Sequence, residues 1–93
     1  MEIEYDPAKR DLVLAARGLD MARCGEAFDG FHTIRPDHRH SASEQRFLST
    51  AVLDETVVII AWTPRDKLRR IITMWKTDDR ERQSYRAARE RSG

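Results

Sequence analysis

The stretch from Arg70 to Tyr85, RIITMWKTDDRERQSY, holds the residues of this chain that are best suited to bind and cleave a phosphodiester. Its pattern predicts a strand that carries cations, a short turn and then a helix. Because strand side chains alternate between faces, we expect Arg70 and Lys76 on one face and Trp75 on the other. Glu81 and Tyr85 follow one turn apart on the helix. Fixed cations beside a carboxylate and a phenol suit phosphate recognition and proton transfer.

The composition is that of a small globular protein. Its 93 residues are 40% apolar and 35% charged, which predicts a single domain over residues 1–93. No apolar run approaches the roughly 20 residues of a membrane span, and the acidic start lacks the regions of a signal peptide. Cys24 is the single cysteine, so no internal disulfide can form and a buried structural thiol is expected. These features together predict a cytoplasmic protein with no membrane association.

The charge is distributed unevenly although the net charge is only +1. Residues 1–30 carry seven acids and four bases, whereas residues 64–93 carry ten bases and five acids. A polyanion would therefore be attracted to the last third of the chain. The small net charge favours a local site over a protein that coats nucleic acid.

Capping signals predict two helices near the start, after a short strand over residues 2–5. Asp6 suits an N-cap and Pro7 suits the first helical position, while Gly18 suits the end of that helix near residue 17. Asp20 can cap a second helix that Asp29 and Gly30 close. The apolar face of that helix comprises Met21, Cys24, Ala27 and Phe28.

Three or four strands are expected next, over residues 31–35, 46–53, 56–63 and 68–75. The segment VVIIAW within the third of these ranges is apolar on both faces, which predicts the central strand. Asp78 and Glu81 fit a capping box for a last helix that has few apolar side chains to bury. The order predicts an α+β fold: two N-terminal helices, an antiparallel sheet of about four strands and a C-terminal helix.

Four short motifs, in order over nearly the whole length, resemble the BrnT toxins of bacterial type II toxin–antitoxin systems. DPAKR at 6–10 resembles the opening D-P-x-K, and RGLDM at 17–21 resembles the H/R-G-[LV]-D/S-F junction of that family. Glu44-Gln45-Arg46 is similar to an E-x-R before the second strand. RIITMWKTDDRERQSY is similar to R-I-I-S-x-R-K-A-x-x-x-E-x-x-x-Y. The shared order and spacing make the resemblance far more specific than any one motif.

The resemblance implies a RelE-like ribonuclease toxin that arrests translation. It implies RNA cleavage by a metal-independent endoribonuclease with no cofactor. It also implies a BrnA-type antitoxin partner, a heterotetrameric complex, and contact with operator DNA only through the antitoxin. Trp75 departs from the family, which commonly has Arg at that position. It could weaken catalysis, or it could stack on an RNA base, a contact worth about 1–3 kcal/mol.

Metal-free cleavage needs cations for the developing phosphorane charge, a base for the 2′-OH proton and an acid for the leaving oxygen. The residues expected to stabilise charge are Lys76, Arg70 and Arg46, those expected to move protons are His40, Glu81 and Tyr85, and those expected to contact RNA are Arg65, Arg69 and Trp75. Each has a structural alternative. The cations could form a solvated strand face or pair with acids, Glu81 could only cap the last helix, and Tyr85 could pack against the sheet.

The loop around Asp37, His38 and His40 could suggest a metal site. No fourth ligand or known ligand spacing supports one, so no metal is expected. His40 precedes the S-x-x-E stretch and is the better candidate for acid–base work near neutral pH.

Two further interpretations stay open. The chain could be a catalytically weak or inactive homologue that acts as a protein-binding module in an autorepressor complex, and Trp75 keeps that alternative open. A DNA-binding domain is less favoured, because no helix-turn-helix stands out and the last helix mixes acids with its arginines.

Overall fold

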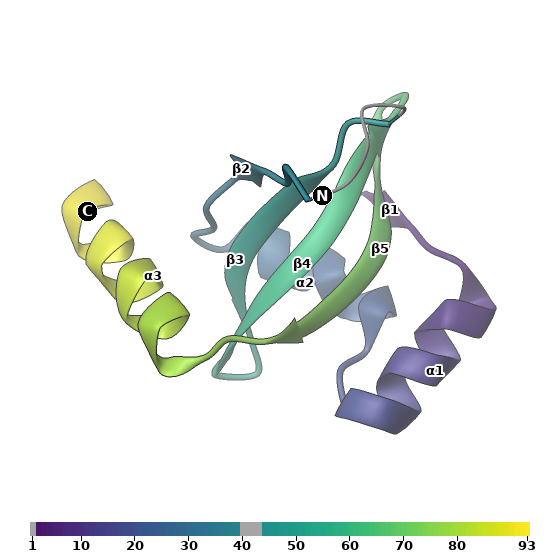
Figure 1. Cartoon of the computed structure of the whole chain (residues 1–93), viewed down its shortest axis with the longest axis horizontal. Helices are drawn as coiled ribbons and strands as arrows, with labels where there is room; N and C mark the ends of the chain where they lie inside the picture. Colours follow the sequence, from purple (N-terminus) through teal and green to yellow (C-terminus); the bar gives the residue numbers. More distant parts are fainter. Residues whose placement is uncertain (1, 40–43) are drawn as a thin grey trace.

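The computed structural model describes residues 2–39 and 44–93, and its centre is a curved sheet with helices on both sides (Figure 1). The helices are α1 (Pro7–Arg17), the 3₁₀ turn η1 (Met21–Arg23), α2 (Cys24–Asp29) and α3 (Asp79–Ser92). The strands are β1 (Ile3–Glu4), β2 (Arg35–Pro36), β3 (Phe47–Leu53), β4 (Thr56–Arg65) and β5 (Leu68–Lys76). The predicted α+β fold is confirmed. In the described residues, no helix is long and apolar enough to cross a membrane.

The first two helical segments start and end where the capping residues placed them. The Asp6 carboxylate accepts a hydrogen bond from the Ala8 N–H at 2.9 Å, and Gly18 ends α1 with a left-handed φ of 70°. Asp20 accepts from the Ala22 N–H at 2.9 Å, which fixes the start of η1. These bonds satisfy donors that a helix start otherwise leaves free, so local sequence alone determined both boundaries.

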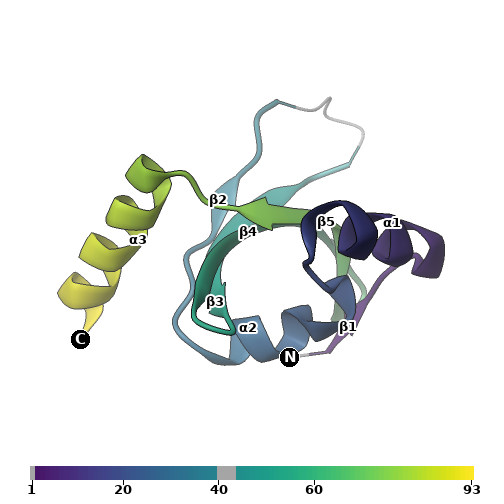
Figure 2. The same cartoon turned by 90° about the horizontal axis from the view of Figure 1, so that it is seen from below.

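β4 is the central strand of the sheet, whose order is β1-β5-β4-β3-β2. Val57 to Trp62 are all buried, which confirms the prediction for VVIIAW. α1, η1 and α2 cover one face of the sheet, here called the covered face (Figure 2). The opposite side is here called the open face, and its apolar residues are Leu48, Ile59, Ala61, Ile72 and Trp75.

Two strands differ from the prediction. The predicted opening strand is present as β1, but it joins the sheet as a fifth strand at the edge, parallel to β5, with Glu4 opposite Arg70. The strand expected over residues 31–35 is wrong, because β2 consists only of Arg35 and Pro36, opposite Leu48 and Phe47. Earlier in that segment, the Thr33 N–H donates to the Thr50 carbonyl, but residues 31–34 do not form a strand.

A bulge in β5 changes which side chains share a face. Ala61 of β4 pairs with Thr73, but its neighbour Trp62 pairs with Ile71, so Ile72 is an extra residue. The alternation of side chains therefore shifts by one position across Ile72. This shift determines the geometry of the candidate site.

α3 lies at the β2–β3 side of the sheet and projects away from it (Figures 1 and 2). Asp78 and Glu81 form the predicted capping box, with both hydrogen bonds at 2.8 Å. Tyr85 is the buried residue of this helix, and its hydroxyl donates to the Phe31 carbonyl at 2.8 Å. A helix with so little buried surface depends on this one anchor and on its caps.

Candidate functional site

Three arginines converge on one end of the open face and are here called the arginine cluster: Arg46, Arg65 and Arg70. They come from the residue before β3, the end of β4 and the start of β5, which are neighbouring strands in the sheet. Together with Lys9 and Glu44 they line a cavity of about 310 Å³. The sheet therefore brings together two of the residues expected to stabilise charge, Arg70 and Arg46, with one expected to contact RNA.

Two carboxylates accompany the arginine cluster at distances too long for hydrogen bonds. Glu4 Oε1 lies 3.5 Å from Arg70 Nη1 and 3.6 Å from Arg65 Nε, while Glu44 Oε1 lies 3.7 Å from Arg65 Nη2. The same Glu4 oxygen is buried and accepts no hydrogen bond from the described residues. Glu4 thus supplies a counter-charge to both guanidinium groups and leaves their N–H donors free for an anion.

Lys76 does not join the arginine cluster, so the predicted shared face of Arg70 and Lys76 is wrong. Lys76 pairs with Val58 of the covered face, whereas Arg70 pairs with Thr63 on the open face. Lys76 lines a different cavity, against the end of α1 and Asp20. The bulge at β5 is the cause, because it reverses the alternation between these two positions.

Arg69 lies on the covered face and packs between aromatic rings. Its guanidinium carbon is 4.4 Å from the ring centroids of both Phe28 and Trp62. Burial lowers the pKa of this guanidinium below its ordinary value. The arrangement is a cation–π contact within the core, and it places Arg69 away from the arginine cluster.

Glu81 and Tyr85 are residues of α3 and lie away from the arginine cluster. One Glu81 oxygen accepts the Asp78 N–H of the capping box. The Tyr85 hydroxyl is engaged by the Phe31 carbonyl, and burial raises its pKa. His40, which was also expected to move protons, lies outside the described residues and its role stays a prediction.

Trp75 lies half-buried on the open face, at the end opposite the arginine cluster. The Arg39 guanidinium carbon is 5.7 Å from the Trp75 ring centroid, within the range of a cation–π contact. The two residues line a cavity of about 390 Å³ that also includes Arg35 and Glu81. An aromatic ring beside cations is the arrangement on which nucleic-acid bases stack.

The loop that could have suggested a metal is organised by an ion pair. Asp37 is buried, and its Oδ1 accepts from Arg39 Nε at 3.0 Å. Within residues 2–39 and 44–93, no group of three His, Cys, Asp or Glu side chains is placed to hold a metal ion.

Four residues at these cavities were not among the predicted site residues: Glu4, Lys9, Arg39 and Glu44. Glu44 was visible as part of the E-x-R motif, and the alternation Glu2 to Tyr5 placed Glu4 opposite Ile3 and Tyr5 on its strand. The contact of Glu4 with two arginines depends on the parallel pairing of β1 with β5, which no local sequence pattern indicates.

Comparison with known proteins gives one family. No curated protein matched the chain. Residues 5–81 match a family described as the ribonuclease toxin BrnT of type II toxin–antitoxin systems. The match includes the arginine cluster and Glu44, and it ends within the first turn of α3. Because it spans most of the sequence, the chain belongs to the BrnT family of ribonuclease toxins of type II toxin–antitoxin systems.

Proposed function

We propose that this ribonuclease toxin binds the scissile phosphate of its RNA substrate at the arginine cluster and cleaves it without a metal ion. The observation that carries the proposal is the set of guanidinium groups around one cavity on the open face, none of which donates a hydrogen bond to a described residue. Unused planar donors of this kind match the oxygens of a phosphate.

The reaction at this site is an attack by the ribose 2′-oxygen on phosphorus. The bond from O2′ to phosphorus forms and the bond from phosphorus to O5′ breaks, which leaves a 2′,3′-cyclic phosphate and a 5′-hydroxyl. Arg46, Arg65 and Arg70 stabilise the charge that develops on the phosphorane oxygens. No redox step or cofactor is needed.

Proton transfer is assigned to two other side chains that line the same cavity. Glu44 has an exposed carboxylate and accepts the proton of the 2′-hydroxyl. Lys9 delivers a proton to O5′, a role that arginine cannot fill because it stays protonated. Glu44→Gln should therefore lower the cleavage rate by about 10²–10⁴, whereas replacing the distant exposed Glu55 by Gln should leave it unchanged.

A type II toxin has a cognate antitoxin, and we propose a BrnA-type partner that docks over β5 and α3 and assembles with the toxin as a heterotetramer. The support is the exposed basic surface of α3 and its single buried anchor, which leave this helix incompletely packed. Release of the free toxin would then arrest translation through RNA cleavage. Hydrogen exchange tests the docking site: added protection over residues 68–90 in the complex supports it, and unchanged exchange there contradicts it.

Trp75 suggests a second candidate function, that of a catalytically weak toxin retained as an antitoxin-binding module. The substitution Trp75→Arg restores the residue that is common in the family. If the native chain cleaves no RNA and Trp75→Arg does, the binding-module function holds. If the native chain cleaves and Trp75→Arg cleaves less well, Trp75 contributes to substrate binding.

A further inference from the structure

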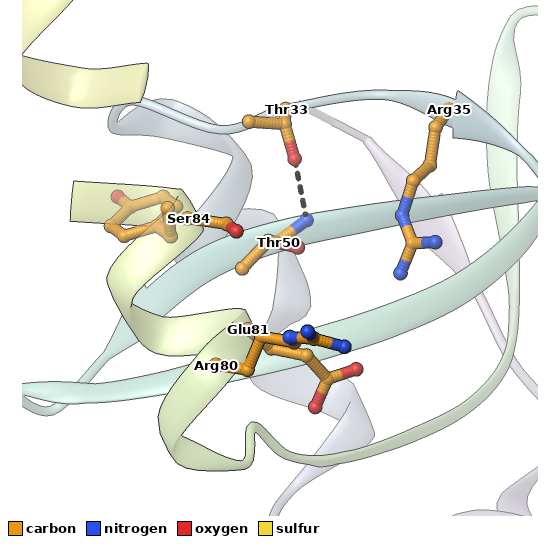
Figure 3. A pocket seen from close by; sticks show the side chains of 7 residues that line it. Thr33, Arg35, Thr50, Arg80, Glu81 and Ser84 are labelled. Carbon is orange, nitrogen blue, oxygen red and sulfur yellow. Dashed lines mark hydrogen bonds between the residues drawn. The ribbon is translucent and has the colours of Figure 1, made fainter. Parts of the chain in front are cut away.

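A groove lies between α3 and the open face of the sheet, away from the arginine cluster. Two cavities, of about 440 and 390 Å³, share Arg35 and Glu81 and together form this groove. Figure 3 shows Arg35 of β2 on one side of it, with Glu81 and Ser84 of α3 on the other and Thr50 of β3 between them. The ribonuclease reaction as described above does not use the groove.

The floor of the groove offers a stacking surface. Trp75 is half-buried there, next to Leu48, and Arg39 lies 5.7 Å from its ring centroid. A flat aromatic ring with a guanidinium nearby can stack on any nucleobase, whatever the RNA sequence. Stacking of this kind provides affinity for nucleobases in general, but it does not select one base.

The walls of the groove carry hydrogen-bonding groups of opposite kinds. One Glu81 oxygen accepts the Asp78 N–H, and the other accepts no hydrogen bond from the described residues. Arg35 points into the groove from the opposite side, and its guanidinium makes no hydrogen bond or ion pair within residues 2–39 and 44–93. The groove therefore presents a carboxylate acceptor facing a guanidinium donor.

Guanine is the base whose edges match this pair. Its N1–H and N2–H₂ groups donate to a carboxylate, and its O6 and N7 accept from an arginine. Adenine presents an acceptor, N1, where the carboxylate requires a donor. We propose that the groove is a guanine-binding subsite, in which Trp75 stacks on the base, and Glu81 and Arg35 read its edges. The proposal rests on the proposed function, because it assigns the sequence preference of that RNA cleavage.

The position of Trp75 relates the subsite to the cleavage point. Because of the bulge, Trp75 and Arg70 both lie on the open face, five residues apart on β5. At about 3.3 Å per residue this separation is roughly 16 Å, which is longer than the span of one nucleotide. The recognised guanine would therefore lie in the same RNA strand as the scissile phosphate but not next to it.

Binding can be measured without cleavage by using 2′-deoxy hexanucleotides, which lack the attacking hydroxyl. Each oligonucleotide has uracil at five positions and a test base at the sixth. Quenching of Trp75 fluorescence reports binding, and the buried Trp62 serves as an internal reference. We expect the guanine oligonucleotide to bind about tenfold more tightly than the adenine one. Inosine, which lacks the N2 amino group, should lose several-fold in affinity.

Glu81→Gln is the decisive variant because glutamine can also complete the capping box, so α3 should stay folded. In this variant guanine and inosine should bind alike. Arg39→Ala should weaken all the oligonucleotides, whereas Lys67→Ala, which removes one charge from an exposed turn, should change affinity little. Equal binding of the guanine, adenine and inosine oligonucleotides, or a guanine preference that survives Glu81→Gln, overturns the proposal.

The outcomes also separate the subsite from the phosphate site and from the antitoxin. If Arg70→Ala leaves cleavage intact while guanine binding follows the pattern above, the phosphate site fails and the subsite stands. If Arg70→Ala abolishes cleavage but cleavage by the native chain shows no base preference, the subsite fails and the phosphate site stands. Quenching of Trp75 by the antitoxin and by no oligonucleotide assigns the groove to the antitoxin and overturns the proposal.

Discussion

Arg70 and Lys76 lie on opposite faces of the same strand, although six residues of regular strand would place them on one face. Ile72 is the bulged residue between them, and it directs Arg70 to the open face and Lys76 toward α1. The consequence is that the proposed phosphate site is built from arginines at the ends of three neighbouring strands and not from one strand. It also brings Trp75 to the same face as Arg70.

The first prediction uses this difference between the two cations. Arg70→Ala should lower the RNA cleavage rate by about 10²–10³, the scale for losing one preorganised donor at a transition state. Lys76→Ala removes the same charge from the covered side and should change the rate by less than about threefold, since weak surface electrostatics is all that is lost. Single-turnover cleavage of one defined RNA measures both. Equal losses in the two variants would contradict the assignment.

The second prediction concerns Glu4 as a positioning residue for Arg65 and Arg70. Glu4→Gln keeps the shape of the side chain but removes the counter-charge, so the two guanidinium groups should repel and lose their alignment. We expect kcat to fall by about tenfold, the scale at which misplacement of a reacting group is felt, while KM stays constant or falls as net positive charge increases. A rise in KM with kcat unchanged would mean that Glu4 acts through overall binding alone.

The third prediction concerns acid stability through Asp20. Its two carboxylate oxygens accept from Arg10 Nε and Nη2, both at 2.8 Å, and this pairing lowers its pKa to about 2. A pKa below that of the unfolded chain means that the stabilisation is complete above about pH 4 and is lost as the pH falls toward 2. Asp20→Asn should lower the free energy of unfolding by about 1–2 kcal/mol at pH 7.

Denaturant unfolding at pH 7 and at pH 2 measures that difference. The gap between Asp20→Asn and the native chain should narrow strongly at the lower pH, because pH 2 lies at the pKa of the native carboxylate and about half of it is then protonated. Asp11→Asn is the matched control, since Asp11 is an exposed partner of the same arginine. A gap of the same size at both pH values would show that the charge is not its cause.

The fourth prediction concerns the anchor of α3. Tyr85→Phe removes the hydrogen bond to the Phe31 carbonyl but keeps the ring that packs on Phe31 at a centroid distance of 5.5 Å. The loss should be about 1 kcal/mol, and it should increase amide exchange in α3 more than in β4. Exchange measured by mass spectrometry resolves the two elements, and an equal increase in both would indicate global and not local destabilisation.

The sequence predicted the helices best because their boundaries depend on neighbouring residues. Asp6, Gly18 and Asp20 each act on the backbone within a few positions, and each acts as predicted. The bulge at Ile72 and the parallel pairing of β1 depend on packing between distant strands, and a sequence pattern with a period of two cannot reveal them. For that reason Arg46, Arg65 and Arg70 could be named as candidates, while Glu4 and the separation of Lys76 could not.

The most direct test of the phosphate site is cleavage of a defined RNA by the purified toxin in excess EDTA, with analysis of the product ends. We expect cleavage that EDTA does not inhibit, products with 2′,3′-cyclic phosphate and 5′-hydroxyl ends, and a loss of about 10²–10³ in rate for Arg70→Ala. Cleavage abolished by EDTA and restored by a divalent metal, or full activity in Arg70→Ala, would contradict the proposal.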